Sequence, residues 1–457
     1  MNSKHEVDNI RVERLLFLDY RLFRNAEIKF SFPLTVLVGI NGRGKSSILD
    51  ALSRHLSWLV SRVEKGKGVG SGLLESDISN FSADISSSQV VATFKVGNAL
   101  DGDSVQYKSI LTAKLAISKS FSSTSVSTNL EDYTKYGEII REQRKKQKYM
   151  NLPLIASYGV ERSWVMRKNK RRSKFSADDA LEQGKVFSSA LMGTKSFQAT
   201  SFLDWFVSFS KLADNSRDAK KKEKANRSIC LMKKVLKEVI PGFENIKLDL
   251  SRGVDDLYVE INGTEVLFEQ LSDGQRLFVS LVADIVWRLI ELNPNRIDPL
   301  QGYGIVLVDE VELHLHPTWQ QTILPGLIKI FTGLQFIVTT HSPQVLSTVK
   351  SDAIRLLNNG AEEQGKVTFQ KPLFETKGRE SSDVLAEVMQ THPRPEVEEK
   401  QWLSECYRLI LSTKDEDISR AKDILNKIKD HFGRTSFEYQ SLNGMLQGIG
   451  KDADEVH

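Results

Sequence analysis

The hydrophobic pattern at the start of the chain changes from alternating to continuous. Apolar and polar residues alternate in residues 12–17 and 26–32, and an unbroken apolar run follows at 34–39. Alternation is typical of strands with an exposed face, whereas an unbroken run is typical of a buried strand. Residues 45–59 then carry apolar residues at helical spacing. The pattern predicts two exposed strands, a buried strand, a glycine-rich turn and a helix.

A mainly helical stretch separates two groups of predicted strands. Strands are predicted within residues 89–117, and a serine run at 118–128 separates them from a helical region that contains one short apolar run at 152–158. After residue 240 the strand patterns return, with helices between them. The predicted strands are 243–267, 305–308 and 335–340, and the predicted helices are 274–292 and 318–331.

The composition is that of a globular protein. Its 457 residues suffice for roughly three domains, and the 40% hydrophobic and 27% charged fractions exclude wholesale disorder. The 63 Lys and Arg against 59 Asp and Glu give a net charge of +4, too small to indicate nucleic-acid binding by itself. Cys230 and Cys406 lie far apart, and no run reaches the roughly 18 apolar residues of a membrane span. We therefore expect a cytoplasmic protein without a membrane partner.

A glycine-rich loop lies between the predicted buried strand and the helix. Its sequence, Gly39-Ile-Asn-Gly-Arg-Gly-Lys-Ser, matches the phosphate-binding pattern GxxxxGK[ST]. Backbone N–H groups of such a loop surround a phosphate, and glycine permits the close approach. We expect Lys45 to bridge the β- and γ-phosphates and Ser46 to ligate Mg²⁺. The predicted nucleotide-binding residues here are Asn41, Gly42, Arg43, Gly44, Lys45, Ser46 and Ser47.

Two adjacent acids follow a later buried strand. Asp309 and Glu310 come directly after Ile305-Val-Leu-Val, at the carboxyl end of the strand, where parallel sheets bind their ligands. We expect Asp309 to hold the Mg²⁺ shell and Glu310 to polarise the attacking water. The alternative is an acid pair at the exposed end of a strand.

The segment Leu271-Ser-Asp-Gly-Gln opens the predicted helix 274–292. Such a helix start is an anion site or a plain N-cap. It resembles the LSGGQ signature of ABC-type ATPases, with Asp273 in place of the first glycine. The resemblance implies that Ser272, Gly274 and Gln275 contact ATP held by another subunit. Two copies would then sandwich ATP and a monomer would be inactive. The departures from the family pattern, Asp273 and the unidentified Q-loop, point to a slow ATPase.

A histidine follows the last predicted buried strand, within Thr339-Thr-His-Ser-Pro. This segment resembles the switch histidine of the same family, which implies that His341 senses the γ-phosphate and orders Glu310 and the water. His314 and His316 occupy the position of the family's D-loop. Because a third and a fourth metal ligand are missing, we favour a subunit-contact loop or a helix start at Pro317 over a metal site. The glutamine of the family's Q-loop is not identified, and position alone suggests Gln89.

Longer segments of the sequence narrow the resemblance to particular groups of ABC-type ATPases. Residues 10–42 look like the SMC, Rad50 and RecF group of ABC-type ATPases. Residues 309–320 and 340–346 resemble the PtuA ATPases of Septu anti-phage systems, which also occur with retrons. This resemblance implies a homodimer or higher homo-oligomer and a PtuB-like HNH nuclease partner. In a retron it also implies a reverse transcriptase with its RNA and DNA.

We therefore predict an α/β fold built on an ABC-type ATPase head with a mixed sheet and a Rossmann-like P-loop core. A mainly helical region is inserted into the head, and a helical tail follows it. The predicted parts are residues 1–129 and 241–375 for the head, 130–240 for the insertion and 376–457 for a partner-binding tail.

Basic residues cluster in the insertion, at 162–174 and 217–227. They would bind a nucleic-acid backbone in a salt-dependent manner, or form a solvated surface. Nucleic-acid binding would favour a DNA-repair clamp of the RecF or SMC kind over a nuclease scaffold. OLD-type nucleases carry a metal-binding domain after the head, but here Asp415-Glu-Asp lies in a charged helical stretch without a preceding apolar strand. We therefore predict that the chain has no nuclease activity of its own.

Overall fold

The computed structural model divides the chain into two compact units, Met1–Val384 and Leu385–His457. The described residues are 10–81, 84–97, 110–120, 123–147, 150–160, 186–187, 199–250, 255–359, 367–391, 394–412 and 414–454.

A six-stranded sheet forms the centre of the first unit, in the order β14-β13-β3-β12-β11-β7. All its neighbouring strands are parallel except the β13–β14 pair. Every residue of β3, β11 and β12 is buried, as their unbroken apolar runs predict. The strands are β3 (Leu34–Val38), β7 (Leu154–Tyr158), β11 (Gly304–Val308), β12 (Leu334–Thr339), β13 (Ile354–Asn359) and β14 (Val367–Gln370). The predicted α/β fold with a mixed sheet is confirmed.

A second, antiparallel sheet has the order β2-β1-β4-β5-β6. Its strands are β1 (Ile10–Tyr20), β2 (Phe23–Lys29), β4 (Ser87–Val96), β5 (Ile110–Lys119) and β6 (Thr124–Asn129). The two predicted exposed strands, β1 and β2, are exposed on one face only, because alternate residues of each are buried.

The serine run at 118–128 is not a separator, and that prediction was wrong. It continues β5 and forms β6, and Ser118 lies opposite Ser125 in the antiparallel pair. All of β6 is exposed, so its side chains show no hydrophobic alternation. Strands pair through backbone groups, so β6 can be recognised from its pairing with β5 but not from its side-chain pattern.

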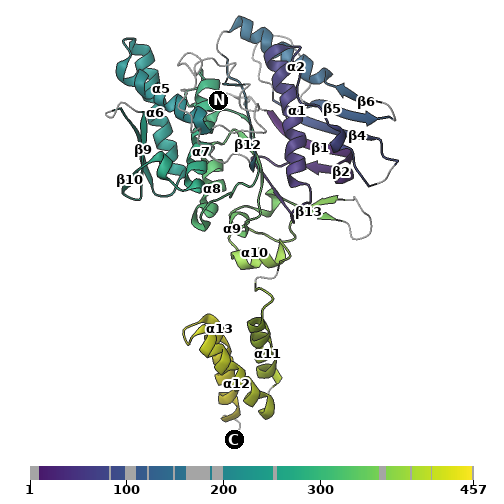
Figure 1. Ribbon diagram of the computed structural model, residues 1–457, viewed down its shortest axis with the longest axis vertical. Coiled ribbons are helices and arrows are strands. Elements are labelled where there is room, and N and C mark those ends of the chain that lie inside the picture. The colour runs from purple at the N-terminus through teal and green to yellow at the C-terminus, as the bar shows by residue number, and fades with distance from the viewer. Residues whose placement is uncertain are drawn as a thin grey trace, which may run out of the picture. The chain divides into compact units, whose positions relative to one another are not determined.

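A third sheet, in the order β10-β9-β8, is also antiparallel. It consists of β8 (Phe243–Asp249), β9 (Asp256–Ile261) and β10 (Thr264–Leu267). Figure 1 shows β9 and β10 beside α5 and α6, whereas α1 and α2 lie with β4 and β5 on the other side of this unit.

The helices of the first unit are mostly amphipathic, but α7 is buried along nearly its whole length. Such all-round burial is typical of a helix in the core of a large domain. The helices are α1 (Lys45–Lys65), α2 (Glu131–Lys146), α5 (Ala199–Asn215), α6 (Ala219–Val239), α7 (Asp273–Leu292), α8 (Pro317–Ile330), α9 (Pro343–Leu346) and α10 (Ser381–Glu387), the last of which crosses the unit boundary. Within the described part of the chain, no helix is both long and apolar enough to cross a membrane.

Residues 130–240 contain α2, α5 and α6 but also β7, which pairs with β11 in the central sheet. The segment expected to be an insertion thus contributes a strand to the core of the head. The second unit is helical, with α11 (Glu398–Ser412), α12 (Asp415–Phe432) and α13 (Phe437–Asp454) around its own apolar core.

Candidate nucleotide-binding site

The phosphate-binding loop joins β3 to α1, as predicted, and takes a backbone that glycine accommodates. Gly44 has a φ of +91°, and a Cβ built on it would lie 2.6 Å from Cζ of Phe23. Another residue at this position would therefore be strained and would collide with the ring. Gly44 is also the N-cap of α1 and supplies no capping side chain, so the first N–H groups of the helix are available to an anion.

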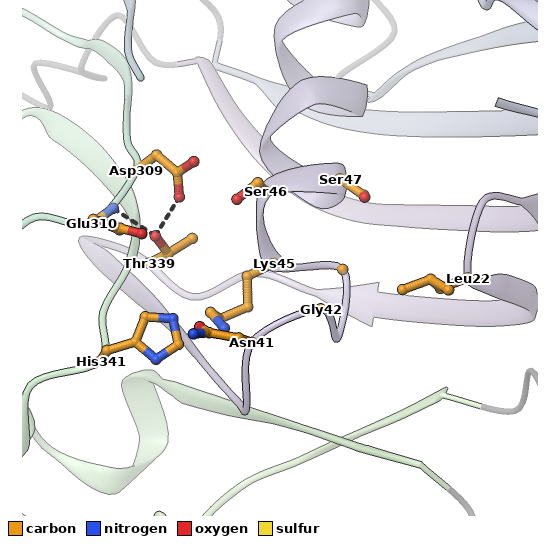
Figure 2. Close-up of a pocket in the computed structure, with 11 residues that line it drawn as sticks. Leu22, Asn41, Gly42, Lys45, Ser46, Ser47, Asp309, Glu310, Thr339 and His341 are labelled. Carbon is orange, nitrogen blue, oxygen red and sulfur yellow. Dashed lines mark hydrogen bonds between the residues drawn. The ribbon is translucent and has the colours of Figure 1, made fainter. Parts of the chain in front are cut away.

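A cavity of about 290 Å³ lies where this loop meets the ends of β11 and β12. Figure 2 shows the loop residues on one side and the acids and His341 facing them. The lining residues are Leu22, Asn41, Gly42, Gly44, Lys45, Ser46, Ser47, Asp309, Glu310, Thr339 and His341. The structure thus brings together most of the predicted residues, which lie as much as 300 positions apart. Arg43, Ser272, Gly274 and Gln275 do not line this cavity.

The two acids are held by Thr339 at the end of the neighbouring strand. The Glu310 N–H donates to Oγ1 of Thr339 at 2.7 Å, and that hydroxyl donates to Oδ1 of Asp309 at 2.5 Å (Figure 2). Glu310 has a φ of +48°, an uncommon conformation for a residue other than glycine. Such strain persists where surrounding contacts impose it, and it clusters at functional sites.

Thr339 and Leu22 also line the cavity, although no sequence pattern predicted a role for either. Thr339 could have been suspected as a polar residue at the end of a buried strand, two positions before His341. Leu22 lies in the turn between β1 and β2 and carries no comparable signal.

The Lys45 side chain lies against the phosphate-binding loop that precedes it. Its Nζ donates to the carbonyl oxygens of Gly39 at 2.6 Å and Ile40 at 3.1 Å. Burial lowers the pKa of Lys45, and the nearby carboxylates of Asp309, Glu310 and Glu312 oppose this shift. The ammonium is thus partly removed from water and faces several negative charges, a setting suited to a bound polyphosphate with a metal ion.

The His341 ring also borders the cavity. Burial lowers its pKa first and the positive Lys45 lowers it further, while Glu312, Glu310 and Asp309 act in the opposite direction. Because an ordinary histidine has a pKa of about 6.5, the lowered pKa leaves the ring neutral at pH 7. A neutral imidazole can both donate and accept a hydrogen bond.

Ser272 is the N-cap of α7. The plain N-cap, which the sequence offered as the alternative to an anion site, is therefore present with both of its hydrogen bonds. Its Oγ accepts from the Gln275 N–H at 3.3 Å, and Oε1 of Gln275 accepts from the Ser272 N–H at 3.0 Å. Gly274 packs closely on the segment after the acids, since a Cβ there would lie 2.0 Å from the carbonyl oxygen of His314. Asp273 forms an ion pair with Arg276. The role of Ser272, Gly274 and Gln275 in contacting another subunit's nucleotide stays a prediction.

Comparison with known families shows to which family the chain belongs. The family described as "AAA domain, putative AbiEii toxin, Type IV TA system" (AAA_21) matches residues 34–347, which include all the cavity-lining residues except Leu22. The chain belongs to this ATPase family.

The relatives of this AAA_21 ATPase include retron and Septu proteins. It is 30% identical to the "Retron Ec83 probable ATPase" of Escherichia coli, over 94% of this chain and 85% of the relative. It is 28% identical to the "Retron Vc95 probable ATPase" of Vibrio cholerae, over 93% and 88%. The "Septu protein PtuA" of Bacillus mycoides is 30% identical, but over 28% of this chain and 18% of the relative. Among solved structures, the SMC head bound to the C-winged helix domain of ScpA has a TM-score of 0.45 at 13% identity, covering 79% of this chain and 97% of that one. The sequence comparisons confirm an ATPase related to PtuA and to retron ATPases.

The remaining predicted residues of the AAA_21 ATPase lie elsewhere. His316 caps α8 and Pro317 occupies its first turn, which confirms the predicted helix start. Gln89 lies in β4, where it pairs with Ala116 of β5, and it does not line the cavity. The basic cluster at 162–174 falls outside the described residues, whereas most of the cluster at 217–227 forms the first turns of α6.

Proposed function

We propose that this AAA_21 ATPase binds ATP in the cavity between the phosphate-binding loop and the ends of β11 and β12, and hydrolyses it there. One observation carries the proposal: the cavity gathers Lys45, Asp309, Glu310 and His341 from distant parts of the chain. A cation for the phosphates, a carboxylate for a metal, a second carboxylate for water and a histidine beside them are the groups that phosphoryl transfer to water requires.

Each residue then has one task. Lys45 neutralises charge on the β- and γ-phosphates, and the loop N–H groups hold the β-phosphate. Glu310 polarises the attacking water, and the neutral His341 ring hydrogen-bonds at the γ-phosphate and keeps the water in line. The hydroxyl of Thr339 fixes both acids relative to the strand ends.

The residues of the cavity fit Mg²⁺. Ser46 supplies a hydroxyl and Asp309 a carboxylate, and Mg²⁺ in nucleotide sites takes its other ligands from phosphate and water. The described residues contain no group of three or more His, Cys, Asp or Glu side chains that could hold a metal ion. The site therefore suits an ion that binds together with ATP, and this ion would neutralise charge on the reacting phosphates.

We further propose that two copies of the chain sandwich ATP. Ser272 and Asp273 are exposed at the start of α7, and the positive end of that helix favours an anion. The capping box leaves the Ser272 hydroxyl on the surface, where a second copy can present its nucleotide. Ser272→Arg should then spare ATP binding and block closure of the dimer.

In the same proposal, the chain is the ATPase subunit of a bacterial defence complex in the cytoplasm. Its rate of ATP hydrolysis is slow because of Asp273. The support is its relation to retron ATPases and to the Septu protein PtuA. Its partners would be a PtuB-like HNH nuclease, held and regulated by the second unit, and, in a retron, a reverse transcriptase with its RNA and DNA. The chain itself would cut nothing, since Asp415–Asp417 lie in the first turn of α12 and Asp417 accepts a hydrogen bond from Ser412. Nuclease activity of the pure chain in Mg²⁺ or Mn²⁺ would refute this part.

The deciding experiment uses Glu310→Gln, which keeps the binding groups but removes the carboxylate that polarises water. With ATP, native mass spectrometry should show a trapped dimer or higher oligomer, and phosphate release should fall steeply. Lys45→Ala is the control and should show neither ATP binding nor dimer. A Glu310→Gln variant that stays monomeric with ATP refutes the sandwich, and one that hydrolyses ATP normally refutes the role of Glu310. Affinity purification of the same variant from its host should recover the HNH partner.

A second candidate function, a clamp that binds DNA directly, is favoured by the surface of α6. Lys220, Lys221 and Lys222 are consecutive and exposed in its first turn. Replacing all three with Glu should abolish a salt-dependent DNA affinity if the clamp is correct. The matched control replaces the exposed Lys422 and Lys427 of α12 with Glu. Equal DNA affinity of the three-lysine variant and the wild type would reject this candidate.

A further inference from the structure

The turn that carries His341 is gripped by two polar side chains from the segment after the acids. Oε1 of Glu312 accepts from the His341 N–H at 2.6 Å. The hydroxyl of the next residue, Ser342, donates to Oε1 of Gln320 at 2.6 Å, and Nε2 of Gln320 donates to the carbonyl oxygen of Leu315 at 2.8 Å. The His341 N–H is therefore held from the segment that follows β11, and the Ser342 hydroxyl is held from α8.

Glu312 makes this contact at a cost. Its Oε2 is buried and has no hydrogen-bond partner among the described residues. A buried carboxylate oxygen without a partner is unfavourable, so stability alone does not explain why this side chain lies against the His341 turn. Glu312 does not line the nucleotide cavity, whereas the His341 ring does (Figure 2). Any effect of Glu312 on bound ATP must act through another residue.

The electrostatics around His341 agree with this placement of Glu312. Burial and Lys45 lower the pKa of His341, and among the three carboxylates that oppose them Glu312 acts most strongly. For Lys45 the order is reversed, since Asp309 and Glu310 act more strongly than Glu312. The geometry agrees: Glu312 accepts the His341 N–H, whereas Asp309 and Glu310 line the cavity together with the loop.

We propose that Glu312 and Gln320 are positioning residues that hold the His341 turn so that its imidazole stays aimed into the nucleotide cavity. This inference rests on the proposed role of His341 in ATP hydrolysis. Without the two side chains, the backbone of the turn remains, but both of its hydrogen bonds to the segment after the acids are lost. The ring then spends less time in the orientation that hydrolysis needs, while the groups that bind ATP are untouched.

Steady-state ATPase kinetics of the full chain test the proposal. Glu312→Ala should lower kcat roughly tenfold or more with KM for ATP unchanged, since one charge-assisted hydrogen bond is lost. Glu312→Gln should recover most of kcat, because its amide oxygen still accepts the His341 N–H and the variant keeps the shape of the site. Gln320→Ala should lower kcat by less. The controls, Glu223→Ala and Gln321→Ala on exposed helix surfaces, should match the wild type.

A double variant separates positioning from general structural damage. In a His341→Ala background, Glu312→Ala should cause no further loss of kcat, because the ring to be positioned is gone. An equal loss in both backgrounds overturns the proposal, and so does a Glu312→Gln variant as slow as Glu312→Ala. If His341→Ala itself hydrolyses ATP at the wild-type rate, the proposed function of His341 fails and the positioning role fails with it. If His341→Ala is slow and Glu312→Ala is not, only the positioning role fails.

Discussion

Thr339→Val removes one hydroxyl and keeps the shape of a fully buried side chain. That hydroxyl accepts from the Glu310 N–H and donates to Asp309, so the substitution breaks two hydrogen bonds at once. A buried N–H left without an acceptor costs about 1–3 kcal/mol. Asp309 borders the cavity, where water can replace the lost donor. We therefore expect the free energy of unfolding to fall by about 1–3 kcal/mol.

The effect on catalysis should be larger than the effect on ATP binding. Glu310 keeps its φ of +48° only while its surroundings impose it, and the Thr339 hydroxyl is part of them. When this anchor is lost, the carboxylate that we propose polarises water is no longer fixed. We expect kcat to fall about tenfold to a hundredfold, since each 1.4 kcal/mol or so of barrier is tenfold in rate. The Kd for ATP should change by less than about threefold, because Lys45 and the loop remain.

Urea unfolding, phosphate release and fluorescent-nucleotide titration measure these three quantities. Thr339→Ser should retain both hydrogen bonds and restore kcat. Thr134→Val is the matched control, because the Thr134 hydroxyl donates to a carbonyl oxygen one helical turn away, in α2. A Thr339→Val variant with wild-type kcat would refute the reasoning, and so would a Thr339→Ser variant as slow as Thr339→Val.

Three other variants test the structure at separate places. Gly274→Ala should lower the unfolding free energy by about 1–3 kcal/mol, since its Cβ would lie 2.0 Å from the His314 carbonyl oxygen, and unchanged urea unfolding would contradict this close contact. His55 has its pKa lowered to about 3 by burial, so between pH 6.5 and pH 5 only the unfolded state takes up its proton. Wild-type stability should therefore fall over this range by roughly 1.1 kcal/mol per pH unit more than that of His55→Gln, with the slope approaching about 1.4 kcal/mol per unit near pH 5, and equal slopes would disprove the assignment. Lys45→Ala should abolish binding of fluorescent ATP, whereas Lys65→Ala, at the other end of α1, should bind normally; binding by both would remove Lys45 from the site.

The residues of the candidate nucleotide site could be picked out from the sequence because their main signals are local. The glycine-rich loop, the acids after a buried strand and the histidine after the next one are each contained in fewer than ten consecutive residues. The apolar runs of β3, β11 and β12 show that these strands are buried, and parallel strands place their carboxyl ends at one edge. The meeting of Lys45, Asp309 and His341 in one cavity follows from those two facts.

Other features depend on which segments pair, and no local pattern contains that information. The exposed β6 has no hydrophobic alternation, and β7 joins the central sheet from within a mainly helical region. Thr339 bridges to Asp309 across 30 positions, and Glu312 reaches His341 across 29.

The sequence by itself thus determined the chemistry of the candidate nucleotide site: which side chains follow which buried strands, and the glycine-rich loop beside them. Only the tertiary structure decided how these side chains are held. Hydrogen bonds such as those of Thr339 and Glu312 form between the ends of β11 and β12 and the segments that follow them, which are neighbours in space and distant in the chain. Side-chain periodicity reports whether a segment is buried, but not which other segment it will meet.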